Sequence, residues 1–139
     1  MTTDTGLVVS TEGSFSDVIS RVTDELKEEG FGVLTRIDMH LAFVEKLGEN
    51  FRPYAILGAC NPTLAYQALT GRPEVGLLLP CNVTVDQVSD DTCEVRILDP
   101  LEMLDAPRYA ADEGLAEIAR EARARLGRVA ASISATQST

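Results

Sequence analysis

The chain has 139 residues, of which 45% are apolar and 24% charged, and its formal net charge is −10 at pH 7. This length and balance predict one globular domain over residues 1–139, which buries roughly 70% of the surface that its unfolded chain exposes. The acidic excess disfavours nucleic acid and anionic membrane surfaces as partners, and no apolar run approaches the roughly 20 residues that span a bilayer.

The cysteines and the start of the chain indicate a cytoplasmic protein. Three cysteines are an odd number, which argues against a complete intramolecular disulfide framework, and in the cytoplasm they stay reduced. Residues 1–5 lack the basic and apolar regions of a secretory signal peptide. We therefore expect cytoplasmic localisation.

A short β-branched run at residues 7–10 predicts the first strand, and Ser14 begins the first helix. Asp17, three residues later, forms a weak capping box with Ser14. Apolar residues follow at helical spacing on one stripe, as expected of a helix that packs on a core: Phe15, Val18, Ile19, Val22 and Leu26. Gly30 suits the left-handed residue that closes a helix, with Phe31 packing back on Leu26.

The next strand and helix have less regular patterns. Residues 31–37 predict a strand with Phe31, Val33, Thr35 and Ile37 on one face. A helix capped by Asp38 then runs to Leu47 and is ended by Gly48. Its apolar residues are spread nearly all round, which suits burial on two sides, including against a second subunit. A poorly amphipathic helix of a monomer fits the same pattern.

Residues 54–58 predict a third strand, which leads into a helix with unusually clear end signals. Asn61 is a good N-cap, and Pro62 stands at the first helical position, where its missing N–H costs nothing. Gly71 ends this helix.

Residues 75–79 and 83–88 are strand-like, but Pro80, Cys81 and Asn82 interrupt them. Because proline cannot donate to a sheet ladder, we place a bulge or bend there, near a sheet edge. A return strand follows, with the alternating apolar residues Cys93, Val95 and Ile97.

Residues 101–108 connect this strand to a last helix, whose arginines point away from its apolar stripe. The stripe consists of Leu115, Ile118, Ala119, Ala122, Leu126 and Val129. Residues 131–139 predict a frayed tail, because the end of the chain lacks an apolar period.

Two short segments, residues 58–62 (GACNP) and 79–83 (LPCNV), each place a Cys-Asn pair beside a proline at a break between regular elements. If the two strands are neighbours in the sheet, the pairs converge and form a pocket for a small molecule or anion. The predicted ligand-binding residues are Tyr54, Gly58, Cys60, Asn61, Cys81 and Asn82. The plainer interpretation is that Cys60 is a buried apolar residue and Asn61 only a cap, since free cysteine is among the most buried residue types.

Metal and catalytic signatures are weak. Cys60 and Cys81 are 21 residues apart, unlike the close cysteine spacing of zinc sites, and His40 is the single histidine. A soft site formed by Cys60, Cys81 and Met103 would suit Cu(I), although no spacing signature supports it. The sequence shows no glycine-rich phosphate loop, nucleophile elbow or paired acid motif.

The chain resembles the domain-of-unknown-function 302 family over most of its length. The resemblance is carried by residues 29–38 (EGFGVLTRID), 47–62 (LGENFRPYAILGACNP), 64–69 (LAYQAL), 76–85 (GLLLPCNVTV) and 98–104 (LDPLEML). It implies an α+β fold, a two-layer α/β sandwich in which helices pack on a curved, largely antiparallel sheet. It also suggests a homodimer, and it supplies no activity, substrate, cofactor or catalytic residue.

Three hypotheses about function follow. The first is a non-enzymatic, homodimeric small-ligand-binding or accessory protein that uses the two Cys-Asn segments. The second is a thiol-based redox or soft-metal-binding protein that uses Cys60 and Cys81, because a helix start favours a thiolate at Cys60. In the third, the two segments serve only the fold and the dimer.

Overall fold

The computed structural model describes residues 6–105, 109 and 111–136. In chain order its elements are β1 (Gly6–Glu12), α1 (Phe15–Glu28), β2 (Gly32–Asp38), α2 (Met39–Leu47), β3 (Tyr54–Cys60), α3 (Pro62–Gly71), the 3-10 helix η1 (Pro73–Leu78), β4 (Cys81–Ser89), β5 (Thr92–Leu98), the 3-10 helix η2 (Pro100–Asp105) and α4 (Glu113–Thr136). Every helix within the described residues is too short or too polar to cross a membrane.

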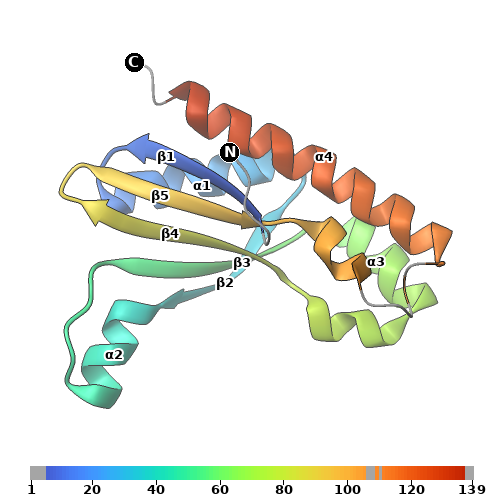
Figure 1. Cartoon of the computed structure of the whole chain (residues 1–139), viewed down its shortest axis with the longest axis horizontal. Coiled ribbons are helices and arrows are strands. Elements are labelled where there is room, and N and C mark those ends of the chain that lie inside the picture. Colours follow the sequence, from blue (N-terminus) through green and yellow to red (C-terminus); the bar gives the residue numbers. More distant parts are fainter. Residues whose placement is uncertain (1–5, 106–108, 110, 137–139) are drawn as a thin grey trace.

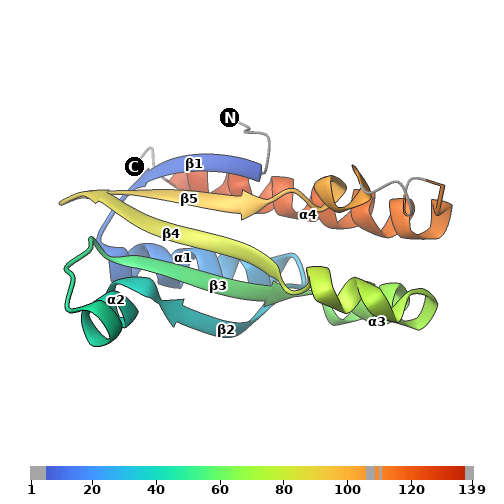
Figure 2. The same cartoon turned by 60° about the horizontal axis from the view of Figure 1, so that its bottom comes forward.

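The five strands form one antiparallel sheet in the order β1-β5-β4-β3-β2. Helices α1 and α4 lie side by side behind it and cover one face (Figures 1 and 2). Helix α3 and η1 extend beyond the end of the sheet from which β3 leaves and β4 enters (Figure 2). The predicted α+β architecture is confirmed.

The core lies between the sheet and the helices α1 and α4, and strand alternation explains its composition. Cys93, Val95 and Ile97 of β5 are almost completely buried, as predicted. Val83 and Val85 of β4 stand beside them, opposite Ile97 and Val95 in the register. Burying each such side chain contributes roughly 1.5–3 kcal/mol.

The ends of α1 follow the predicted capping chemistry. The Ser14 hydroxyl accepts a hydrogen bond from the Asp17 N–H at 3.2 Å. At the other end, the N–H of Phe31 donates to Leu26 O (2.9 Å), and that of Gly30 donates to Lys27 O (3.0 Å). With Gly30 at φ 84°, these bonds form a Schellman motif, and Phe31 and Leu26 are both buried.

The predicted alternation of β2 is wrong. The register shifts between Val33, which pairs with Ala59, and Thr35, which pairs with Gly58. Leu34 is therefore the extra residue of a β-bulge, and its side chain is 69% exposed. Phe31 lies outside the strand because the closure of α1 uses it. Local alternation cannot predict this outcome, because a bulge exchanges the faces of all the residues beyond it.

The strand predicted at residues 75–79 is also wrong, because this segment forms η1. Pro73 opens η1 with a fixed φ, and the N–H of Val75 donates to Arg72 O at 3.0 Å. Val75 is 1% exposed in a cluster with helical residues, so tertiary packing overrides its β propensity.

The prediction of a bulge or bend at residues 80–82, near a sheet edge, is also wrong. Strand β4 is the central strand and begins at Cys81, so Pro80 lies just before the ladder, after a cis peptide bond from Leu79. The irregularity of β4 lies at its other end, between Gln87 and Ser89. Proline is tolerated here because the ladder does not yet need its N–H.

The predicted frayed tail is wrong as far as Thr136. Helix α4 continues to that residue, and Ile133 is 1% exposed in the core cluster. Ile133 follows Val129 by four residues and so extends the same apolar stripe. Residues 137–139 lie outside the described part of the chain.

Candidate ligand site

The two Cys-Asn segments meet at one end of neighbouring strands. Strands β3 and β4 pair so that Ala59 lies opposite Cys81 and Gly58 opposite Asn82. Cys60 is the last residue of β3 and Cys81 the first of β4. The backbones of the two segments therefore converge as predicted, and both cysteines are among the residues that line the same cavity.

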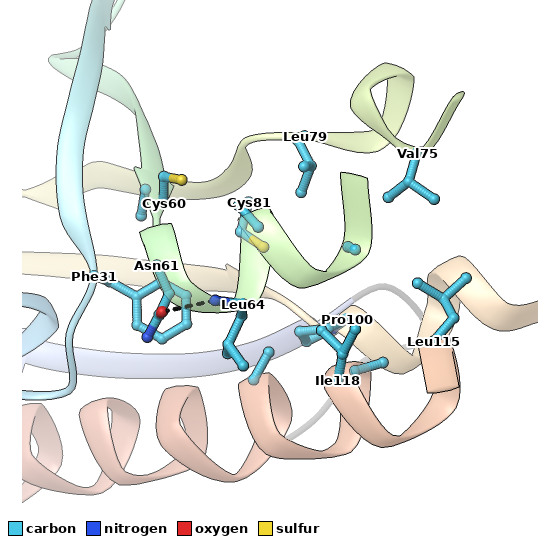
Figure 3. A pocket seen from close by; sticks show the side chains of 15 residues that line it. Phe31, Cys60, Asn61, Leu64, Val75, Leu79, Cys81, Pro100, Leu115 and Ile118 are labelled. Atoms are coloured by element: carbon cyan, nitrogen blue, oxygen red, sulfur yellow. Dashed lines mark hydrogen bonds between the residues drawn. The ribbon is translucent and has the colours of Figure 1, made fainter. Parts of the chain in front are cut away.

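This cavity has a volume of about 50 Å³ and lies between the end of the sheet, α3, η1 and the first half of α4 (Figure 3). Its walls are mainly apolar. They are formed by Phe31, Ala59, Cys60, Asn61, Leu64, Ala65, Ala68, Val75, Leu79, Cys81, Pro100, Leu115, Ile118, Ala119 and Ala122.

The cavity lies at the junction of two hydrophobic clusters. Phe31 and Ala59 belong to the main core cluster under the sheet. Val75 and Leu115 belong to a smaller cluster, with Ala68 and Tyr109, between α3, η1 and α4. Imperfect packing between the two clusters leaves the space in which the cavity forms.

Alanines explain why the space stays open. Ala65 and Ala68 are spaced i, i+3 on α3, and Ala119 and Ala122 have the same spacing on α4. Residues at this spacing share one helix face, so both helices present short side chains to the cavity. Ala59 adds a fifth short side chain from the sheet.

Asn61 contributes less to the cavity than its position suggests. Its side-chain Oδ1 accepts the N–H of Leu64 at 3.1 Å, which caps α3 (Figure 3). Its Nδ2 lies near Gly30, where a built Cβ atom would come within 2.9 Å of it. The residue is buried, and its Oδ1 satisfies the helix start, as the plainer interpretation of Asn61 expects.

The two thiols are the other polar groups in the cavity wall. Burial, with a smaller contribution from the neighbouring Cys60, raises the pKa of Cys81 to about 11. Cys81 is therefore a neutral thiol at physiological pH, which makes it a poor nucleophile. Cys60 is half-buried, and both cysteines are free.

Three of the predicted site residues lie outside the cavity wall. Gly58 faces Thr35 and Pro80, and a Cβ atom built on it would collide with Thr35 Oγ1 and lie 2.7 Å from Cγ of Pro80. Asn82 is exposed. Tyr54 stands at the other end of β3, roughly 20 Å away at ~3.3 Å per residue.

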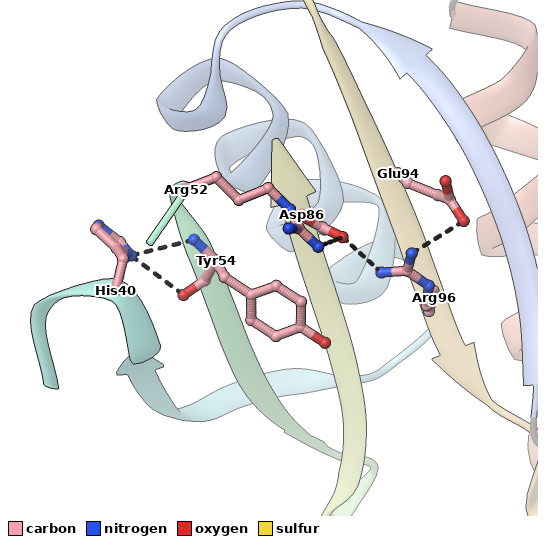
Figure 4. A network of polar contacts seen from close by, with 6 residues as sticks. All are labelled: His40, Arg52, Tyr54, Asp86, Glu94 and Arg96. Carbon is pink, nitrogen blue, oxygen red and sulfur yellow. Dashed lines mark hydrogen bonds and ion pairs between the residues drawn. The ribbon is translucent and has the colours of Figure 1, made fainter. Parts of the chain in front are cut away.

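Tyr54 instead lies beside a polar network on the sheet face away from α1 and α4 (Figure 4). Arg52 donates two hydrogen bonds to Asp86, at 2.6 and 3.2 Å, and Arg96 donates one at 3.0 Å. Arg96 also pairs with Glu94 at 3.1 Å. The Asp86 side chain is 1% exposed, so the two arginines cover and neutralise it.

Sequence reasoning missed both the alanine wall and this network. The spacing of the alanines is visible in the sequence, but the sequence does not show that α3 lies beside α4. The signal for the network was an acid, Asp86, directly after the buried strand residues Val83 and Val85. Its partner Arg52 is 34 residues away in the chain, so their pairing depends on the sheet register.

Among the described residues, the structure adds no metal ligand to the two cysteines of the soft-metal hypothesis. Within the described residues, no group of three or more histidine, cysteine, aspartate or glutamate side chains could hold a metal ion. The side chain of Met103, the third ligand considered for Cu(I), lies outside the described part.

Comparisons with known proteins agree on the family. The model of the family described as "Domain of unknown function DUF302" matches residues 7–133. The chain is also similar to a solved structure described as the crystal structure of uncharacterized conserved protein DUF302 from Bacillus stearothermophilus. The identity is 30%, the match covers 94% of this chain and 99% of that chain, and the TM-score is 0.82. No curated protein matches the chain.

Proposed function

The chain belongs to the DUF302 family, and we propose that it is a non-enzymatic, homodimeric protein that binds a small, largely apolar ligand in the cavity between β3, β4, α3 and α4. The observation that carries the proposal is the alanine-lined void between the two hydrophobic clusters. Three free cysteines suit the reducing cytoplasm, where we place the protein.

The void has a cost that a purely structural junction would avoid. Protein interiors are close-packed, with few spaces larger than a water molecule. This space of about 50 Å³ opens to the surface, so its apolar lining stays in contact with solvent and the hydrophobic gain of burying it is lost. A single larger side chain at one of the alanines would fill much of it, so its retention supports a role in binding.

The walls favour an apolar ligand group of a few non-hydrogen atoms. On the scale where ~10–15 Å³ holds one water, the cavity admits only a few such units. None of the described residues that line the cavity is a lysine, arginine or histidine, the donor atom Nδ2 of Asn61 lies near Gly30, and Cys81 is an uncharged thiol. An anion therefore finds little compensation inside, and we restrict the proposal to an apolar group.

The thiol-based alternative uses Cys60 and Cys81 and requires a reactive thiolate, which burial opposes at Cys81. Titration of thiol reactivity against pH separates the two functions. We expect Cys81 to stay unreactive until the pH approaches about 11. Thiolate formation at Cys60 or Cys81 well below pH 8 would favour the redox or soft-metal function instead.

Xenon, which enters apolar cavities, is a suitable probe of the site. Under xenon pressure, we expect saturable amide chemical-shift changes around Ala68, Leu115 and Ala119 in wild-type protein. The variant Ala119→Val fills the cavity and should lose these changes while unfolding at the same or a higher temperature. Ala116→Val, on the same helix but outside the wall, is the matched control and should keep them. Absence of the changes in the wild type, or their persistence in Ala119→Val, would refute the site.

A further inference from the structure

Large apolar side chains are exposed to solvent on β2, α2 and the loop that follows. Six of them are between 43% and 69% exposed: Leu34, Ile37, Leu41, Val44, Leu47 and Phe51. These elements form one side of the molecule, away from α4 (Figures 1 and 2). We name these six residues the α2 patch.

Helix α2 is well anchored at both ends, although it buries little. The N–H of Tyr54 donates to Nδ1 of His40 at 3.1 Å, and Gly48 closes the helix with φ 68°. The ring of Phe43 packs edge-on against Phe51, with centroids 5.3 Å apart. Yet none of its nine residues, all within the described part, is buried. A helix this short is marginal alone, so covering its apolar surface would stabilise it.

The bulge in β2 determines how a partner can approach. Strand β2 is an edge strand, and bulges on edge strands hinder pairing with another strand. The bulge also turns Leu34 outward. A partner is therefore expected to pack side chains against the α2 patch rather than to extend the sheet.

The charge distribution favours a second copy of the chain as the partner. The whole chain carries −10, so most of its surface repels another copy. Residues 34–51, which contain the α2 patch, carry two bases and three acids, a net charge of −1: Arg36, Lys46, Asp38, Glu45 and Glu49. Arg52, the next residue, is paired with Asp86 and adds no free charge. This side therefore carries only a small part of the total charge, and two copies repel each other less here than elsewhere.

The patch is smaller than one partner's share of a standard interface, so it would form only the centre of a dimer interface. Its six side chains expose on the order of 500 Å² per copy, within the ~300–600 Å² typical of the largest patch on a monomer and below the ~800 Å² per partner of a standard interface. We propose that two copies pack their α2 patches together about a two-fold axis, with α2 at the centre. This inference rests on the homodimer in the proposed function and assigns its surface.

Sedimentation equilibrium over roughly 1–100 μM tests the surface. We expect wild-type dimers and at least ~100-fold weaker association for both Leu41→Glu and Val44→Glu, because each would bury an unpaired charge. Both side chains are at least half exposed, so the monomer fold should survive, which circular dichroism checks. Leu77→Glu, at an 87% exposed position on η1, is the matched control and should dimerise like the wild type.

The outcomes separate the surface from the rest of the proposal. A wild-type protein that stays monomeric overturns both the dimer and its surface. A wild-type dimer that survives Val44→Glu, or that Leu77→Glu dissociates, overturns the surface alone. Xenon binding in the cavity is independent of all three results.

Discussion

Asp86 lies on the sheet face opposite α1 and α4, yet its side chain is 1% exposed. Burial alone would raise its pKa, but the hydrogen bonds from Arg52 and Arg96 outweigh burial and lower it. Because the folded state holds this carboxylate ionised, its contribution to stability is present above its unfolded pKa of ~3.9 and is lost as the pH falls through its folded pKa.

The variant Asp86→Asn should therefore lower the free energy of unfolding at pH 7 by about 1–3 kcal/mol, less than for a fully buried pair because both arginines reach solvent. The difference from wild type should shrink below about pH 4. Urea denaturation at pH 7 and pH 3 measures it. Asp24→Asn, at an exposed site on α1, is the control and should change stability by less than ~0.5 kcal/mol. A difference that does not depend on pH would contradict the ionic role.

At the scale of elements, the helices α1, α3 and α4 meet at the C-terminal end of α1. Gly30 is left-handed, and Asn61, the cap of α3, packs against it. Nη1 of Arg125 on α4 donates to Glu29 O at 3.1 Å, next to Gly30. The closure of one helix thus helps to position the start of α3, where the candidate site begins.

Gly30→Ala should destabilise the fold by about 2–3 kcal/mol, because it adds left-handed strain of ~1–2 kcal/mol and displaces the Asn61 amide. Gly48→Ala separates the two effects. Gly48 has a similar φ of 68°, but a Cβ built there meets nothing within 4 Å, so it should cost only the strain. Denaturant unfolding of both variants measures the difference, and equal losses would show that Asn61 adjusts freely.

The elements that sequence predicted correctly are those whose signals are local. Ser14, Gly30, Asn61 and Pro62 mark helix ends through their own side-chain and backbone chemistry, and each stands where expected. The errors arise where distant packing decides. Val75 is β-branched but packs among helices, and the bulge at Leu34 depends on how β2 meets β3.

The residues of the candidate site also divide into those that the sequence could place and those that depend on distant packing. Cys60 and Cys81 could be placed together because paired strands bring their ends side by side. Asn82 could not be separated from Cys81 without the register, which places it opposite Gly58 and leaves it exposed. The alanines of α3 and α4 could not be assigned to the cavity wall, because helix spacing alone does not say which faces meet.

At the scale of the whole molecule, the two hydrophobic clusters differ in size. Among the described residues, the main cluster has 19 buried members, and the cluster formed by Ala68, Val75, Tyr109 and Leu115 has four. Regions with few buried apolar contacts open locally at lower free energy than the core. The junction between the clusters, where the cavity lies, is thus the natural plane along which α3 and η1 separate from the rest.

Native-state hydrogen exchange should detect this opening. We expect the amides of α3, such as that of Ala68, to exchange at least ~100-fold faster than that of Val22 in α1. Ala68 and Val22 are both buried helical residues, but they pack in different clusters, so the comparison isolates tertiary packing. Xenon should slow exchange in α3 and leave α1 unchanged, because a ligand that fills the cavity stabilises only the closed form. If α3 and α1 exchanged together through global unfolding, the two clusters would form one cooperative unit, and the ligand would have to enter without this separation.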